Sequence, residues 1–336
     1  ASLGGGDMYG AREGAALAIE LKADLLWLLN DLYMLRNYSH TWHSLKEKGI
    51  RTIGYIPLDG EIIDAAILEN TLFFDDLVLY TQWARGQVEQ GLELSGKKGP
   101  ALHVVHHGVD QDFFQPAPND EKEKLRQVLF PDLAPDTILL LNANRYNERK
   151  DIPATIRAFE MAVPRFTCET KLLLHTPGVD KERLSELQTL VNRSEQAERI
   201  LINPLGNDYV SEEVLRSLYQ VCAVGINTSV GEGWGLISFE HAACGAVQVV
   251  PEHSAPAELW KGNALLVPAP EPCWLSTSPF RMRKIQTEIL AEFLVQLVNN
   301  PGQRLLLSEK SRRLATSTAT QWKKAAADWR KIFLHE

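Results

Sequence analysis

Short apolar runs alternate with amphipathic stretches along most of the chain. Runs of this length indicate buried strands, and the stretches between them have the spacing of helices. Strands that alternate with helices are typical of parallel sheets covered by helices, so the sequence predicts an α/β protein. The expected strands are residues 25–29, 52–56, 77–80 and 102–105 in a first set, and residues 138–141, 171–174, 200–202, 223–226, 246–250 and 265–267 in a second.

A segment containing Pro116, Pro118 and Asn119 separates the two sets of strands and is expected to be a linker. We therefore predict two Rossmann-like domains, residues 1–115 and 119–317, facing a cleft at the carboxyl ends of their strands. Helices are expected near residues 11–22, 39–48, 62–70, 84–92, 152–161 and 319–333.

The first domain is expected to be incomplete. It begins with the helical residues 11–22 where an α/β domain usually begins with a strand, and it has only four expected strands. Gly4, Gly5 and Gly6 are either the remainder of a glycine-rich loop or a flexible tether.

Charge and cysteine content limit the classes of function. The 35 basic and 43 acidic side chains give a net charge of -8, which argues against a broad nucleic-acid interface. The four cysteines, Cys168, Cys222, Cys244 and Cys273, have no metal-ligand spacing and are expected to be reduced. No apolar run approaches the roughly 20 residues of a membrane span, so we expect a cytoplasmic protein without stable membrane insertion.

Two glutamates mark the expected site of the chemistry. Glu232 and Glu240 are eight positions apart, with Gly233 and Gly235 between them, after the expected strand 223–226. A strand that ends in a glycine-bearing loop and continues as a helix leaves free N–H groups that bind phosphate. Carboxylates on either side accept hydrogen bonds from hydroxyls. The pattern predicts a ligand with both phosphate and hydroxyl groups, such as a nucleotide sugar.

A basic pair follows the first strand of the second set. Arg145 and Lys150 lie after residues 138–141, at a position where open α/β sheets bind ligands. An arginine offers a fork of donors and a lysine a compact charge, so the pair can hold a diphosphate. The alternative is a solvated basic turn.

Three motifs, in this order and spacing, resemble those of the retaining glycosyltransferases with the GT-B fold, family GT4 (glycosyltransferase group 1). They are Asn144-Arg145 with Lys150, the Glu232 and Glu240 pair around Gly-Trp-Gly, and Ala242-Ala243-Cys244-Gly245-Ala246-Val247. The resemblance covers residues 104–267 and includes His107-Gly108-Val109-Asp110 with Phe114 and Pro116. It also implies that residues 318–336 return to the first domain.

The resemblance implies a role for each motif residue. Arg145 and Lys150 would grip the donor diphosphate, Glu232 the sugar hydroxyls, and Glu240 the ribose hydroxyls. The donor-binding segment would also include Gly233, Trp234, Gly235 and Leu236, with the backbone of the last two approaching the phosphates.

Alternatives exist for several of these residues. Glu240 is otherwise an exposed helix residue, Glu232 a residue that orders the loop, and Trp234 is expected to pack rather than to stack on a base. Family members often place a polar residue of the first domain near the reacting carbon, and Asp31 and Asp59 follow expected strands. Either aspartate can instead stabilise a turn, Asp59 beside Pro57 and Gly60.

The resemblance implies front-face substitution, in which the leaving diphosphate takes the proton of the acceptor. Arg145, Lys150, Glu232 and Asp59 would be the catalytic residues. We expect no cofactor and no metal, because the paired acidic residues Asp75 and Asp76 precede a strand and the basic pair supplies the compensating charge.

The predicted function is the transfer of a sugar from a UDP-, GDP- or ADP-linked donor to an acceptor hydroxyl on a glycan, lipid, protein or small molecule. The alternative is a non-catalytic nucleotide-sugar-binding protein or a donor-binding fragment. A dinucleotide-dependent oxidoreductase is disfavoured, because no Gly-x-Gly-x-x-Gly follows an early strand.

Overall fold

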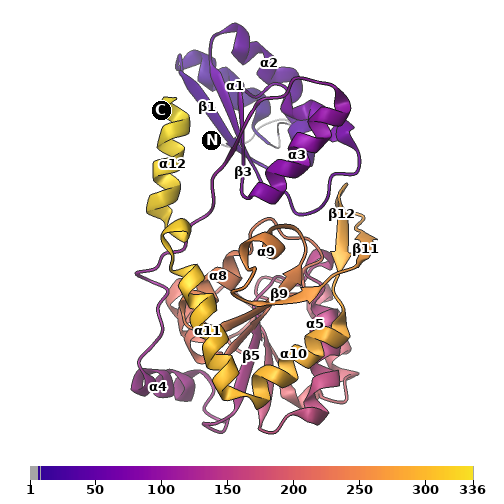
Figure 1. The fold of residues 1–336 in the computed structure, drawn as a ribbon, viewed down its shortest axis with the longest axis vertical. Coiled ribbons are helices and arrows are strands. Elements are labelled where there is room, and N and C mark those ends of the chain that lie inside the picture. Colours follow the sequence, from indigo (N-terminus) through magenta and orange to yellow (C-terminus); the bar gives the residue numbers. More distant parts are fainter. Residues whose placement is uncertain (1–6, 8, 336) are drawn as a thin grey trace. The chain divides into compact units, whose positions relative to one another are not determined.

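A computed structural model describes residues 7 and 9–335 and divides the chain into two compact units. Unit 1 comprises the residues up to His106 together with Glu232–Trp234 and Trp274–Met282. Unit 2 comprises His107–Gly231, Gly235–Cys273 and the residues from Arg283 onward. Each unit has a parallel sheet of its own (Figure 1).

The sheet of unit 1 follows chain order. Its parallel strands are β1 (Leu25–Leu29), β2 (Arg51–Ile56), β3 (Asp76–Leu79) and β4 (Ala101–Val104). Because each crossover leads to the next strand in the same direction, right-handed connections place the linking helices on one face. These helices are η1 (Leu32–Asn37), α2 (Ser39–Glu47), η2 (Ala65–Thr71) and α3 (Gln82–Ser95), and α1 (Ala11–Glu20) packs against α2.

Aromatic side chains form much of the core of unit 1. The indole of Trp42 meets the rings of Tyr38, Phe73 and Phe74 edge-on, and its Nε1–H donates to the Ala11 carbonyl at 3.2 Å. Buried aromatic rings favour this arrangement, and a buried indole N–H requires an acceptor. Trp42 therefore ties α1 to the layer of helices over the sheet.

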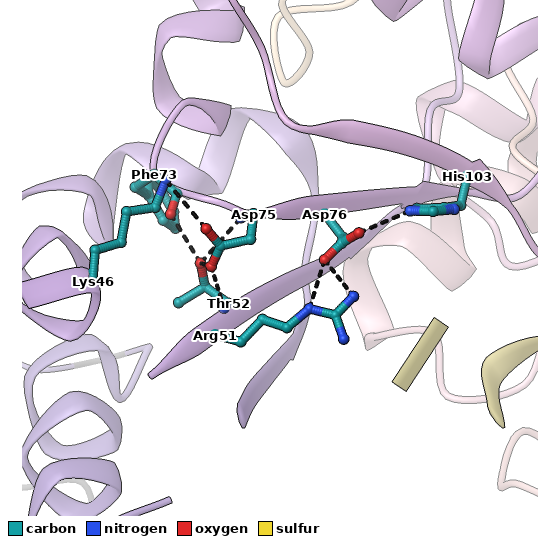
Figure 2. Close-up of polar contacts among 7 residues, drawn as sticks. All are labelled: Lys46, Arg51, Thr52, Phe73, Asp75, Asp76 and His103. Carbon is teal, nitrogen blue, oxygen red and sulfur yellow. Dashed lines mark hydrogen bonds and ion pairs between the residues drawn. The ribbon is translucent and has the colours of Figure 1, made fainter. Parts of the chain in front are cut away.

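The paired aspartates 75 and 76 lie at the amino-terminal edge of this sheet and are occupied by protein partners (Figure 2). Arg51 donates to Oδ2 of the buried Asp76 from Nε at 2.9 Å and from Nη2 at 2.6 Å, and the His103 ring lies 2.8 Å from Oδ1. Asp75 accepts from the backbone and hydroxyl of Thr52. The pair thus crosslinks strands β2, β3 and β4.

The sheet of unit 2 has the strand order β10-β9-β8-β5-β6-β7, and its strands are all parallel. This is the doubly wound order of Rossmann folds, with the reversal between β5 and β8. The strands are β5 (Ile138–Asn142), β6 (Thr170–Leu174), β7 (Ile200–Ile202), β8 (Val224–Ile226), β9 (Val247–Glu252) and β10 (Leu265–Pro268).

Two groups of helices cover this sheet, and right-handed crossovers in opposite directions from the reversal place them on opposite faces. In one group, α5 packs against α10, and α6 contributes Leu187 and Val191 to the shared core. In the other, α4 contacts α7, α7 contacts α8, and α11 packs on α8 and β9. Their bounds are α4 (Asn119–Leu129), α5 (Ile152–Ala162), α6 (Lys181–Asn192), α7 (Glu212–Val221), α8 (Leu236–Ala243), α9 (Ser254–Leu259), α10 (Thr287–Asn299) and α11 (Pro301–Ala315).

Short elements complete the chain. Strands β11 (Glu271–Trp274) and β12 (Arg281–Lys284) form a hairpin whose tip belongs to unit 1, where Arg281 pairs with Glu61 through side chain and backbone. Helix α12 (Trp322–Leu334) is the last of the described helices. The remaining single turns are η3 (Glu148–Lys150), η4 (Val163–Arg165), η5 (Ala197–Arg199) and η6 (Thr318–Thr320).

The start of α12 packs on the first residues of unit 2. A Cβ on Gly108 would lie 2.4 Å from the Trp322 backbone nitrogen, so only glycine allows this approach. The Val109 N–H donates to the Thr320 carbonyl at 2.7 Å, and the rings of His107 and Trp322 are 5.9 Å apart.

All ten predicted strands are present, and the predicted α/β class is confirmed. The helix expected near residues 62–70 is the 3-10 helix η2. Two details differ from expectation: Asn119 begins α4 rather than lying in a linker, and the β11–β12 hairpin was not foreseen. The predicted domain limits, including the return of residues 318–336 to the first domain, stay predictions. Gly4, Gly5 and Gly6 lie outside the described residues, within which no helix is long and apolar enough to cross a membrane.

We predict that Asp76→Asn lowers the free energy of unfolding by about 3 kcal/mol, because it removes the negative charge of the buried carboxylate that pairs with the largely buried Arg51 guanidinium. Denaturant unfolding followed by tryptophan fluorescence measures this change. Glu69→Gln removes the exposed pair with Lys97 and serves as the control, with an expected loss below about 1 kcal/mol. Equal losses in the two variants would contradict the crosslinking role of Asp76.

Candidate functional site

Strands β5 and β8 are neighbours in the sheet although they are far apart in the chain, because the strand order reverses between them. Connections that leave such strands in opposite directions open a crevice at their carboxyl ends, where α/β sheets bind ligands. The loop after β5 carries Arg145 and Lys150, and the loop after β8 leads to Glu232 and α8. The motifs identified in the sequence therefore follow the two strands at the reversal.

The loop after β5 is held from within by the buried Asn142. Its amide donates to Thr155 at 2.8 Å, and its Oδ1 accepts from the backbone and side chain of Asn144 at 3.1 and 2.9 Å. Both asparagines are almost fully buried, whereas Arg145 directly after them is exposed. Hydrogen bonds therefore hold the backbone before Arg145, while the Arg145 side chain is accessible to a ligand.

Hydrogen bonds join the β5 loop to the β8 loop. The Arg149 guanidinium donates to the Gly231 carbonyl at 2.8 Å, and the Val230 N–H donates to the Arg149 carbonyl at 2.8 Å. The buried Thr228 hydroxyl lies within 3.0 Å of the carbonyls of Lys150 and Asp151. These bonds fix the backbone of Lys150 against the strand that leads to the glutamate motif.

A histidine from a third strand end supports the β8 loop. His253 follows β9, is buried, and has its Nε2 2.8 Å from the Ser229 carbonyl. The N–H and the hydroxyl of Ser229 both donate to Oδ1 of Asn227. The segment before Glu232 is therefore restrained by side chains as well as by its backbone.

Helix α8 begins in a way that leaves its first N–H groups accessible. Gly235 has φ of 92°, a left-handed conformation that a residue with a side chain rarely adopts, and this turn directs the chain into the helix. No side chain caps the helix, and Leu236 in its first turn is 40% exposed. The first N–H groups of a helix have no partner within it, and they favour an anion.

Glu240 lies one turn along α8. It is partly buried, and the Tyr219 hydroxyl of α7 donates to its Oε2 at 3.3 Å. Burial raises the pKa of the Glu240 carboxyl to about 7, with a further contribution from the charge of Glu212. Its protonation therefore changes near neutral pH.

Tyr219 is itself enclosed. Its ring stacks on His241, and burial beside Glu240 raises the pKa of its hydroxyl well above the usual value. The hydroxyl consequently remains a neutral donor that orients the Glu240 carboxylate.

Unit 1 brings Glu232 to Asp59. The Glu232 N–H donates to the Asp59 carbonyl at 3.0 Å, and a Cβ on Gly233 would lie 3.0 Å from Asp59 Oδ1. Glu232 is 7% exposed, and the buried Trp234 packs its ring 5.2 Å from that of His106. Two carboxylates that the sequence suggested separately thus lie on adjoining segments of one unit.

Asp31 belongs to the same acidic region. Its carboxylate accepts from the Tyr33 hydroxyl at 3.2 Å. Burial, together with the charges of Asp31 and Asp59, raises the pKa of Tyr80. Acidic side chains therefore gather after β1 and β2, at the carboxyl ends of neighbouring strands.

Several residues of the site were not found from the sequence, namely Tyr219, Arg149, Thr228, His253 and His175. His175 follows β6, is buried, and its Nδ1 has no partner among the described residues; burial lowers the pKa of its ring. In the sequence, His253 and His175 could have been recognised as candidates only because each follows a predicted strand.

The predicted roles of the site residues stay predictions, as does the absence of a metal. The described residues contain no group of three or more His, Cys, Asp or Glu side chains placed to hold a metal ion.

Comparison with solved structures reveals similar folds. Sucrose-phosphate synthase from Thermosynechococcus elongatus matches with a TM-score of 0.71 and 17% identity, over 96% of this chain and 76% of that chain. HepE from Anabaena, in complex with UDP and glucose, matches with a TM-score of 0.72 and 14% identity, over 96% of this chain and 81% of that chain. Alpha,alpha-trehalose 6-phosphate synthase from Burkholderia multivorans matches with a TM-score of 0.69 and 17% identity, over 97% of this chain and 76% of that chain.

No protein-family model and no curated protein sequence matches this chain. The likeness to the solved structures, at identities below a fifth, concerns the fold. Together with the two parallel sheets, it confirms that the chain has the GT-B fold predicted from its motifs.

Proposed function

We propose that the protein is a retaining glycosyltransferase that moves a sugar from a nucleoside-diphosphate sugar to an acceptor hydroxyl. One observation carries the proposal: the reversal between β5 and β8 positions the basic loop and the start of α8, with Glu240 one turn further along. Solved structures of the same fold include HepE in complex with UDP-glucose. A UDP-sugar is therefore the first donor to test, ahead of GDP- and ADP-linked sugars.

The donor end of the proposed site combines two sources of positive charge. Arg145 and Lys150 supply full charges, and the uncapped start of α8 supplies backbone N–H groups at Leu236. Cations and a helix N-terminus stabilise a diphosphate and the charge that builds on it as the glycosidic bond breaks. We assign the ribose hydroxyls to Glu240, whose carboxylate is already oriented by Tyr219.

The reacting sugar is assigned to the acidic residues. Glu232 would hold the sugar hydroxyls, and Asp59, whose carbonyl accepts from the Glu232 backbone, would position the reacting carbon. In the proposed front-face reaction, the bond from the anomeric carbon to the diphosphate breaks as the acceptor oxygen attacks from the same side. The departing diphosphate accepts the acceptor proton, so no separate base is needed. Proximity and electrostatic stabilisation then supply most of the rate enhancement.

We further propose that the reaction is metal-independent, with Arg145 and Lys150 balancing the leaving group. A cytoplasmic location is proposed from the four cysteines, which are all free in the structure. The proposed acceptor hydroxyl belongs to a glycan, lipid, protein or small molecule.

Turnover tests the function directly. With UDP-glucose, GDP-mannose or ADP-glucose in the presence of EDTA, we expect slow donor hydrolysis that is accelerated by an acceptor, with the donor anomeric configuration kept in the product. Glu232→Gln should reduce turnover at least about tenfold, because it removes a charged acceptor of sugar hydroxyls, and leave UDP affinity nearly unchanged. Donor binding without any hydrolysis or transfer would instead indicate a nucleotide-sugar-binding protein.

The phosphate assignment has its own test. Arg145→Ala and Lys150→Ala should each weaken UDP binding by about tenfold or more while changing uridine binding little, since only UDP offers a diphosphate. Calorimetric titration measures both ligands. Arg193→Ala removes an exposed arginine at the end of α6 and should leave both affinities unchanged. Equal losses for UDP and uridine would remove the basic pair from the phosphate site.

Glu240 should make donor binding depend on pH. With a carboxyl pKa of about 7, UDP-glucose affinity is expected to fall by about tenfold from pH 8 to pH 6, because the carboxylate accepts ribose hydroxyls best when ionised. UDP-glucose is the suitable probe, since its diphosphate remains ionised over this range.

Two variants control the pH experiment. Glu240→Gln should bind weakly at every pH with a flat profile, and Glu212→Gln should move the midpoint to lower pH by removing a nearby negative charge. A sloping profile that persists in Glu240→Gln would assign the dependence to another group.

A further inference from the structure

A cavity of about 600 Å³ lies within unit 2, at the opposite end of α8 from the proposed phosphate site. Its walls come from the start of α4 and the residues before it, from the end of α7, from Cys244 and Gly245 after α8, and from the last three turns of α11. Cavities of this size hold small organic molecules. No residue of this cavity belongs to the donor site proposed above.

The charges that line this cavity are unbalanced. Lys122 of α4 and Arg312 and Arg313 of α11 face a single carboxylate, that of Glu309. None of the three cations forms an ion pair with the described residues. The cavity therefore carries an excess of positive charge, although the chain as a whole has a net charge of -8.

The excess of positive charge destabilises the protonated form of Lys122. Burial lowers the pKa of its ammonium, and the neighbouring charges of Arg126 and Arg304 lower it further. A partly desolvated ammonium without a counter-charge is unfavourable, and a bound anion would offset this cost.

Neutral polar groups complete the lining. The amides of Asn119 and Gln220 and the hydroxyls of Ser308 and Thr316 also line the cavity, and Leu305 supplies an apolar wall. Gln220, Ser308 and Thr316 donate to backbone carbonyls, which leaves their oxygens able to accept from a ligand. Amides and hydroxyls hydrogen-bond to a polyhydroxy compound, and each arginine can donate two parallel hydrogen bonds to a phosphate group. Cys244 takes no part as a nucleophile, since burial raises the pKa of its thiol to about 12.

We propose that this cavity is a binding site for a phosphorylated polyhydroxy small molecule, with Lys122, Arg312 and Arg313 holding its phosphate groups. The inference does not depend on the proposed transferase activity. It rests on the volume of the cavity, the excess of cations and the hydrogen-bonding side chains between them.

Calorimetric titration with fructose 1,6-bisphosphate tests the site, with fructose as the uncharged comparison. We expect the bisphosphate to bind and fructose not to bind, and a saturating concentration of UDP to leave the bisphosphate affinity unchanged. Arg313→Glu should weaken binding by at least about tenfold, as expected for loss of a charge-assisted contact and its replacement by a like charge.

The matched control is Lys310→Glu, the same change of charge on an exposed residue of α11 outside the cavity. It should keep the affinity within about twofold. Absence of binding to the wild type, equal losses in Arg313→Glu and Lys310→Glu, or displacement by UDP would each overturn the proposal.

Arg313 is exposed, so the Arg313→Glu variant is expected to fold, and the melting temperature of each variant verifies this. Failure of UDP to bind would count against the transferase proposal alone.

Discussion

The reversal of strand order between β5 and β8 is the constraint on which the proposed donor site depends. Parallel strands joined by right-handed crossovers diverge from this point, and their loops therefore leave the same edge of the sheet next to each other. Thr228 makes this proximity rigid, because its buried hydroxyl contacts the carbonyls of Lys150 and Asp151 across the two loops. A basic residue 78 positions earlier in the chain is thereby held beside the strand that leads to Glu232.

That rigidity matters for the proposed chemistry. A site that stabilises a leaving diphosphate works through groups that are oriented before the reaction begins, because reorientation during the reaction would cost free energy. Here Asn142 and Asn144 hold the base of the Arg145 loop, and Tyr219 orients Glu240. The Arg145 side chain differs from these groups because it is exposed, so it can change its conformation when a ligand binds.

The sequence was sufficient for the strands and for the motif positions, and the reasons are local. Runs such as 138–141 are apolar because both faces of a central parallel strand are covered, and this pattern can be recognised without coordinates. The β11–β12 hairpin could not be recognised in this way. Its residues Glu271 and Arg281 are polar and partly exposed, and its tip is held by a contact between Arg281 and Glu61, 220 positions apart.

The same limit applied to the site. The proximity of Asp59 to Glu232 comes from a backbone hydrogen bond between distant segments, which no periodicity encodes. Tyr219 reads in the sequence as an ordinary buried residue of an amphipathic helix, and only its contact with Glu240 reveals a further role. The partners of the paired aspartates 75 and 76 are equally hidden in the sequence, because Arg51, Thr52 and His103 come from the neighbouring strands β2 and β4.

The two proposed anion sites lie at opposite ends of α8, and the polarity of that helix explains why they are built differently. At the amino end, the helix itself favours negative charge, so a loop with two cations can complete the site. At the carboxyl end, about 12 Å away, the helix dipole opposes an anion, and the Gly245 carbonyl is occupied by the Ser308 hydroxyl. Positive charge must then come from neighbouring helices, as it does from Lys122 on α4 and from Arg312 and Arg313 on α11. Side chains, rather than backbone, are therefore expected to account for the affinity of the second site.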